Sequence, residues 1–70
     1  MSQVVKVRGM TCGHCVNAVR EEFAALPGVS KVEVDLVADG VSTVVVEAEN
    51  ALSDEQVRTA LSEAGGYQLV

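Results

Sequence analysis

The sequence contains few aromatic residues, few cysteines and no long apolar stretch. Its 70 residues include no tryptophan, one phenylalanine, one tyrosine and one proline. No uninterrupted apolar stretch approaches the roughly 20 residues of a transmembrane helix or the roughly 7–15 residues of a signal-peptide core. We therefore expect a cytoplasmic protein that does not insert into membranes.

The small size and the acidic balance exclude further classes. A chain of this length forms one domain, residues 1–70, and buries only about 60 % of its unfolded surface, which argues against a deep pocket for a dinucleotide. The net charge of −5 argues against nucleic-acid binding through phosphate contacts. Residues 1–31 hold four basic and two acidic side chains, whereas residues 32–70 hold one basic and eight acidic ones. This asymmetry fits either a partner surface or chance clustering on a soluble surface.

The hydrophobic pattern changes its period along the chain. Apolar residues at every second position predict half-buried strands, and apolar residues three and four apart predict amphipathic helices. The pattern predicts strands at residues 4–7, 31–36, 41–48 and 67–70, and helices at about residues 15–26 and 54–64.

Turn and capping residues mark the ends of these elements. Pro27 and Gly28 end the first helix, and the Asp39-Gly40 pair indicates a hairpin between the second and third predicted strands. Ser53 and Gln56 have the spacing of a capping box at the start of the second helix. The resulting order, β-α-β-β-α-β, predicts a ferredoxin-like α+β sandwich: a four-stranded antiparallel sheet with two helices on one face.

The only two cysteines, Cys12 and Cys15, lie two residues apart between the first strand and the first helix. A secreted scaffold stapled by several disulfides is therefore excluded. Thiolates are soft donors that favour Cu(I) and Zn(II), and this spacing lets both sulfurs converge on one ion. The unpaired N–H groups and the dipole at a helix N-terminus favour the thiolate over the thiol. Gly9 and Gly13 give the loop freedom to wrap around an ion.

The number of available ligands leaves three interpretations open. A structural zinc site needs four ligands, and near the two cysteines the chain offers only His14. A two-coordinate site suits Cu(I), which tolerates low coordination. The motif alone therefore fits a metal-transfer protein, a redox dithiol, or half of a dimeric zinc site.

Gly-Met-Thr-Cys-Gly-His-Cys at residues 9–15 resembles the signature of the heavy-metal-associated domain. Leu-Pro-Gly-Val at residues 26–29 and the Gly66-Tyr67 pair extend the resemblance over nearly the whole chain. This family includes short bacterial copper chaperones in the cytosol and the N-terminal modules of copper-transporting P-type ATPases. The resemblance implies that Cys12 and Cys15 bind Cu(I) and that the chain transfers it by thiolate exchange to the metal-binding domain of such an ATPase.

The resemblance also bears on three neighbouring residues. Met10 matches a methionine that packs beneath the loop, which makes it a core residue and not a ligand. Tyr67 matches a tyrosine that bacterial members place near the metal, but here the preceding glycine is doubled, Gly65-Gly66. The alternative for Tyr67 is an aromatic residue that packs on the edge of the core. His14 is either an exposed histidine or an auxiliary Cu(I) ligand, particularly in a copper-linked homodimer.

Other functions are compatible with the same Cys-X-X-Cys motif. A thiol-disulfide redox protein would use both cysteines, but the chain has no tryptophan before the motif, and its one proline lies at the end of a helix. The same fold could also carry Hg(II) or Zn(II). A cysteine nucleophile with a histidine base makes poor hydrolase geometry in a loop without a pocket, so we expect no enzyme activity.

Overall fold

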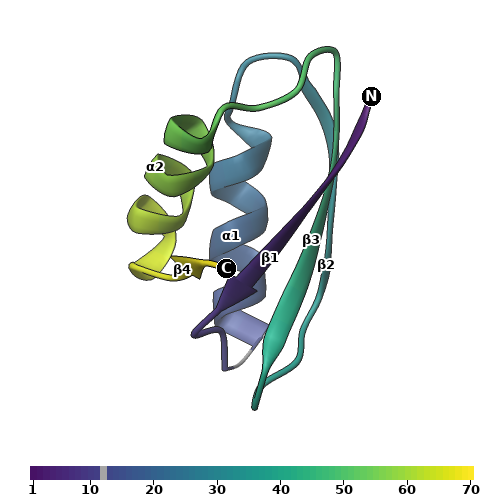
Figure 1. Cartoon of the computed structure of the whole chain (residues 1–70). Coiled ribbons are helices and arrows are strands. Elements are labelled where there is room, and N and C mark those ends of the chain that lie inside the picture. Colours follow the sequence, from purple (N-terminus) through teal and green to yellow (C-terminus); the bar gives the residue numbers. More distant parts are fainter. Residues whose placement is uncertain (12) are drawn as a thin grey trace.

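The computed structural model describes residues 1–11 and 13–70, and Cys12 lies outside the described residues. Four strands and two helices follow in the predicted order (Figure 1). Their bounds are β1 (Ser2–Arg8), α1 (Gly13–Ala24), β2 (Val29–Asp35), β3 (Val41–Ala48), α2 (Asp54–Gly65) and β4 (Gln68–Leu69).

The strands form one antiparallel sheet in the order β2-β3-β1-β4, and both helices cover the same face of it (Figure 1). The ferredoxin-like prediction is therefore confirmed. β1 pairs with β3 along its whole length, from Ser2 opposite Glu47 to Arg8 opposite Val41. Among the described residues, no helix is both long enough and apolar enough to cross a membrane.

The alternation of side chains along the strands places the core between the sheet and the helices. Val5 and Val7 are buried whereas Lys6 and Arg8 are exposed, as the sequence predicts. The same period buries every second residue of β3 from Ser42 to Ala48. The buried apolar core contains Val5, Val7, Met10, Val19, Phe23, Val32, Val44, Val46, Ala48, Leu52, Val57, Ala60 and Leu61.

The start of α2 follows the sequence closely. The Ser53 hydroxyl accepts a hydrogen bond from the Gln56 N–H (3.1 Å), and the Gln56 side chain accepts one from the Ser53 N–H (2.9 Å). The predicted capping box is therefore confirmed. Asp54 and Glu55 occupy the first turn, where the helix dipole favours negative charge.

The bounds of α1 differ from the prediction. The helix begins at Gly13 and ends at Ala24, two residues before Leu26. The Leu26 N–H still donates to the Phe23 carbonyl (3.1 Å), so the last turn tightens as it ends. Because Leu26 precedes Pro27, steric contact with the proline ring disfavours the helical conformation there.

The predicted hairpin between β2 and β3 forms, and Asp39 and Gly40 lie in its loop. A two-residue type I′ turn needs positive φ at both central residues, but neither Asp39 nor Gly40 has one. Instead a turn closes from the Gly40 N–H to the Val37 carbonyl (3.2 Å) within a longer loop. The buried Ser42 hydroxyl holds this loop, because it accepts from the Val37 N–H (2.9 Å) and donates to the Val37 carbonyl (3.4 Å).

We predict that Ser42→Ala destabilises the domain through these bonds. The substitution removes the hydrogen bonds between the buried Ser42 hydroxyl and the Val37 backbone, and a bond of this kind contributes about 0.5–1.5 kcal/mol. Ser30→Ala is the matched control, because the exposed Ser30 hydroxyl makes one bond to the Glu47 carbonyl; we expect its effect to stay within about 0.5 kcal/mol. Urea unfolding measures the free energy of unfolding of both variants. Equal losses in the two variants would contradict the role given to Ser42.

Candidate metal centre

The segment that carries the cysteine motif joins β1 to α1 at the end of the sheet where the β2–β3 loop also lies (Figure 1). Residues 9–11 precede Cys12, which is outside the described residues. Cys15 is the third residue of α1, so it lies in the first turn of the helix as predicted. Its side chain is half-buried and packs against the core.

The electrostatics of the two helix starts differ. The first turn of α1 contains no acidic side chain, whereas Asp54 and Glu55 occupy the first turn of α2. The partial positive charge at a helix N-terminus stabilises a nearby anion. At α1 no carboxylate of the first turn competes for this charge. A thiolate at Cys15 stays a prediction.

Met10 anchors the segment from beneath. Only 1 % of the residue is exposed, and its side chain belongs to the core together with Val19 and Phe23. A flexible thioether fills an irregular gap of this kind well. Residues 9–11 are therefore held against the sheet and α1 by the burial of one long side chain.

Tyr67 lies beside the same segment. A Cβ placed on Gly9 would lie 3.5 Å from Cδ1 of the Tyr67 ring, which is ordinary van der Waals contact. The ring is half-buried and packs against the edge of the core. The doubled glycine Gly65-Gly66 therefore does not keep Tyr67 away from residues 9–11.

The remaining polar residues of the motif face solvent. Thr11 and His14 are both exposed, and His14 is the second residue of α1. Among the described residues, no group of three or more His, Cys, Asp and Glu side chains is close enough to hold a metal ion. A closed four-ligand site built on Cys12 would need three such donors from the described part of the chain, and no such group is found there.

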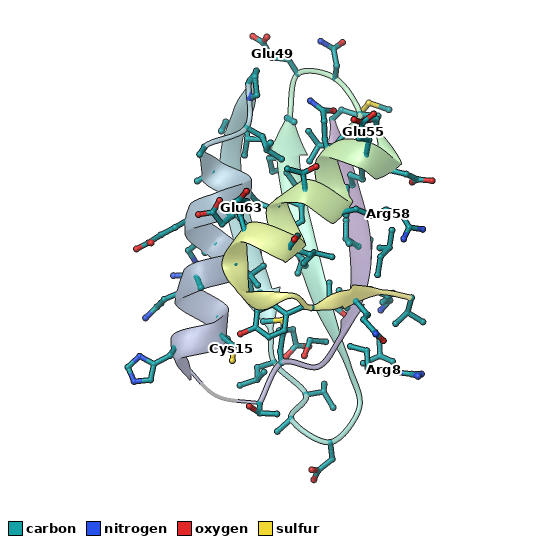
Figure 2. The ribbon with its side chains drawn as sticks, turned by 90° about the vertical axis from the view of Figure 1, so that its left-hand side faces the viewer. Arg8, Cys15, Glu49, Glu55, Arg58 and Glu63 are labelled. Atoms are coloured by element: carbon teal, nitrogen blue, oxygen red, sulfur yellow. The ribbon has the colours of Figure 1, made fainter. Side chains whose placement is uncertain are left out.

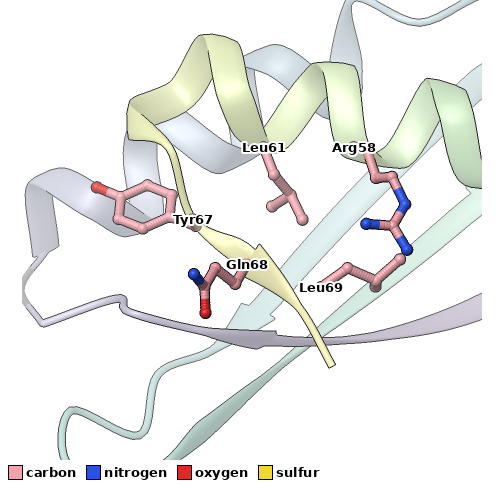
Figure 3. A pocket seen from close by; sticks show the side chains of 5 residues that line it. All are labelled: Arg58, Leu61, Tyr67, Gln68 and Leu69. Carbon is pink, nitrogen blue, oxygen red and sulfur yellow. The ribbon is translucent and has the colours of Figure 1, made fainter.

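A cavity of about 330 Å³ lies beside Tyr67, between α2 and β4 (Figure 3). Its lining residues are Arg58, Leu61, Tyr67, Gln68 and Leu69. Figure 3 shows the Tyr67 ring directed away from the other four side chains, toward the β1–α1 connection. Tyr67 thus belongs to both the wall of this cavity and the surroundings of residues 9–11.

The sequence alone does not show how closely the Tyr67 ring approaches Gly65. A Cβ on Gly65 would lie 2.9 Å from the Tyr67 hydroxyl oxygen and 3.0 Å from Cζ. The doubling of glycine was visible in the sequence as a departure from the family pattern. The contact itself was not, because it depends on how the ring folds back over the end of α2.

Charge is not sorted cleanly between the two ends of the molecule. Figure 2 shows Cys15 and Arg8 near one end, Glu49 and Glu55 toward the opposite end, and Arg58 and Glu63 between them. The β2–β3 loop, which carries Asp39, lies at the same end as Cys15, so that end has charges of both signs.

The comparisons with known proteins agree with the motif and the fold. Residues 4–67 match the heavy-metal-associated domain. The copper chaperone CopZ of Staphylococcus haemolyticus (strain JCSC1435) is 42 % identical over 65 residues, which cover 93 % of each chain. A solved structure described as a CopZ metallochaperone aligns with a TM-score of 0.81 at 27 % identity and covers 100 % of both chains.

A yeast copper transporter domain, solved in apo and Cu(I)-loaded states, has the same fold. It aligns with a TM-score of 0.76 at 25 % identity and covers 97 % of this chain and 89 % of its own. The matched residues include the whole cysteine motif and nearly all of the sheet and helices described above. The chain therefore belongs to the heavy-metal-associated domain family.

Proposed function

We propose that this protein is a cytoplasmic copper chaperone that binds one Cu(I) ion through Cys12 and Cys15. The observation that carries the proposal is the Cys-X-X-Cys motif at the start of α1, in a domain 42 % identical to a copper chaperone. Copper is the cargo of this protein, and no side chain acts as a catalytic residue.

The donor set favours Cu(I) over Zn(II). Two thiolate sulfurs suit a soft ion that tolerates low coordination, whereas structural zinc sites are almost always closed by four ligands. The described residues offer no cluster of three donors that could complete such a site around Cys12. Two similar proteins are described as a copper chaperone and a copper transporter domain, which supports the same choice of metal.

Transfer would proceed by ligand exchange at the exposed end of the domain. A thiolate of the acceptor adds to the bound ion as a third sulfur ligand, and the bond from Cys12 or Cys15 then breaks. The ion stays Cu(I) throughout, and the released cysteine keeps its electron pair and can take up a proton. Copper passes between proteins in this way without a free aqueous ion.

The acceptor would be the metal-binding domain of a copper-transporting P-type ATPase. The resemblance in sequence suggests this partner, and the fold shared with the yeast copper transporter domain supports it. Arg8 lies at the same end of the molecule as Cys15, as does the loop that carries Asp39 (Figures 1 and 2). An acidic group on the acceptor that faces Arg8 would complement it.

Anaerobic titration with Cu(I) against a chromogenic chelator tests the metal and its ligands. We expect one copper per chain, and we expect Cys12→Ser and Cys15→Ser each to weaken binding more than the roughly 10–100-fold that loss of an outer-shell partner costs. Thr11→Ala is the control, because Thr11 is exposed in the same segment and has no thiol. A chain that binds zinc but fails to compete for Cu(I) would refute the proposal. Catalytic reduction of a substrate's disulfide by this protein, under the same anaerobic conditions, would also refute it.

We assign His14 an auxiliary role when two molecules share copper, because an exposed imidazole beside two soft donors can reach a second chain. His14→Ala should then weaken copper binding or reduce copper-linked dimerisation. Chelator competition measures the copper affinity and light scattering measures the mass of the complex, both at about pH 6–8. Affinity and stoichiometry that stay unchanged across this range would show that His14 is only an exposed side chain.

The rate of copper transfer to an acceptor domain should fall as salt rises from about 0.05 M to about 0.5 M, because salt screens the attraction that guides docking. Arg8→Gln should slow transfer at low salt. Glu49→Gln is the matched control at the far end, and it should leave the rate nearly unchanged. Stopped-flow mixing measures these rates. Transfer that is independent of salt, or faster at high salt, would contradict attraction between the docking surfaces.

A further inference from the structure

The Tyr67 ring lies between two glycines from distant parts of the chain. On one side is Gly9, the first residue of the segment that leads to the cysteine motif, and on the other is Gly65, the last residue of α2. A Cβ on Gly9 would meet the ring at 3.5 Å. A Cβ on Gly65 would meet it at 2.9 Å from the hydroxyl oxygen, 3.0 Å from Cζ and 3.1 Å from Cε2.

These distances distinguish the two glycines. The distance at Gly9 is an ordinary contact, so a methyl group there would fit beside the ring as far as space is concerned. A distance of 2.9 Å at Gly65 is shorter than real side chains tolerate, so the ring and a Cβ at position 65 cannot both keep these positions. The observed place of Tyr67 therefore requires the absence of a side chain at Gly65.

The backbone of Tyr67 is less free to move than its ring. The Tyr67 N–H donates to the Leu61 carbonyl (3.4 Å), and the neighbouring Gly66 N–H donates to the same carbonyl (3.0 Å). The next residue, Gln68, pairs with Arg8 in the sheet. The atoms that would clash with a Cβ at Gly65 are at the far end of the tyrosine side chain. A methyl group at this position would therefore rotate the ring away and leave the chain path in place.

We infer that Gly65 is a positioning residue that holds the Tyr67 ring over Gly9 and thereby restrains the segment before the cysteine motif. The burial of Met10 restrains the same segment from the core side. With the ring in place, the segment is restrained by the buried Met10 side chain and by the Tyr67 ring beside Gly9. With the ring displaced, only Met10 holds the segment, and small competing ligands gain access to copper at the motif. This inference rests on the proposed function for its effect on copper, but the ring position itself does not.

Gly65→Ala tests the inference, and Gly66→Ala is its matched control. Both glycines have positive φ, +157° and +75°, so both substitutions strain the backbone, but a Cβ on Gly66 has nothing within 4 Å. Tyr67 is the only tyrosine and the chain has no tryptophan, so intrinsic fluorescence reports this one ring. We expect Gly65→Ala to change the emission of Tyr67 and increase its quenching by acrylamide, whereas Gly66→Ala should leave both close to the parent values.

The second readout is the rate at which a small chelator removes Cu(I) from the loaded protein. Gly65→Ala should raise this rate several-fold above that of Gly66→Ala. In a Tyr67→Ala background the difference between the two glycine variants should disappear, because Gly65 acts through the ring. A difference that persists without the ring, or equal rates and equal fluorescence in its presence, would overturn the inference. Failure of the parent protein to bind Cu(I) would instead overturn the proposed function, and the fluorescence comparison would still decide the position of the ring.

Discussion

The burial of Met10 between the sheet and the helices links the surface segment at residues 9–11 to the core. Full burial of a side chain of this size contributes about 1.5–3 kcal/mol, a large share of the stability available to a domain of 70 residues. Because the chain is too small to surround a ligand, its proposed site has to lie on a surface segment held from beneath. Met10 provides that support, and the ring of Tyr67 lies beside Gly9.

Features of the sequence that act locally predicted the structure well. The capping box of Ser53 and Gln56 involves residues three apart, and the alternation in β1 and β3 follows from the strand period. The hairpin between β2 and β3 was also predicted, but the contact that shapes its loop was not. The Ser42 hydroxyl bonds to Val37, five residues away, and shapes the loop that contains Asp39 and Gly40.

The same distinction applies to the candidate site. The spacing of Cys12 and Cys15 and the place of Cys15 in the first turn of a helix could be predicted, because both are local properties. The position of Tyr67 could not, because it depends on the bond from its backbone to Leu61 and on the missing side chain of Gly65. The family pattern indicated that the tyrosine matters, and only the packing shows which residues hold its ring.

The acidic net charge and the proposed docking end are compatible because the molecule is elongated. Its dimensions are 31 × 19 × 18 Å, so its long axis spans about three Debye lengths at 0.1 M salt. Carboxylates at the far end, such as Glu49, are therefore largely screened from the end that carries Cys15 and Arg8. An approaching acceptor would experience mainly the local charges.

The central claim is that copper passes to an acceptor through a shared intermediate and is not released first. It is tested by mixing the Cu(I)-loaded protein anaerobically with an apo metal-binding domain of a copper-transporting ATPase, in the presence of a chelator that traps free Cu(I). The account predicts that copper reaches the acceptor faster than the trap, at a rate that rises with acceptor concentration. A rate that equals spontaneous loss to the trap and does not depend on the acceptor would contradict it.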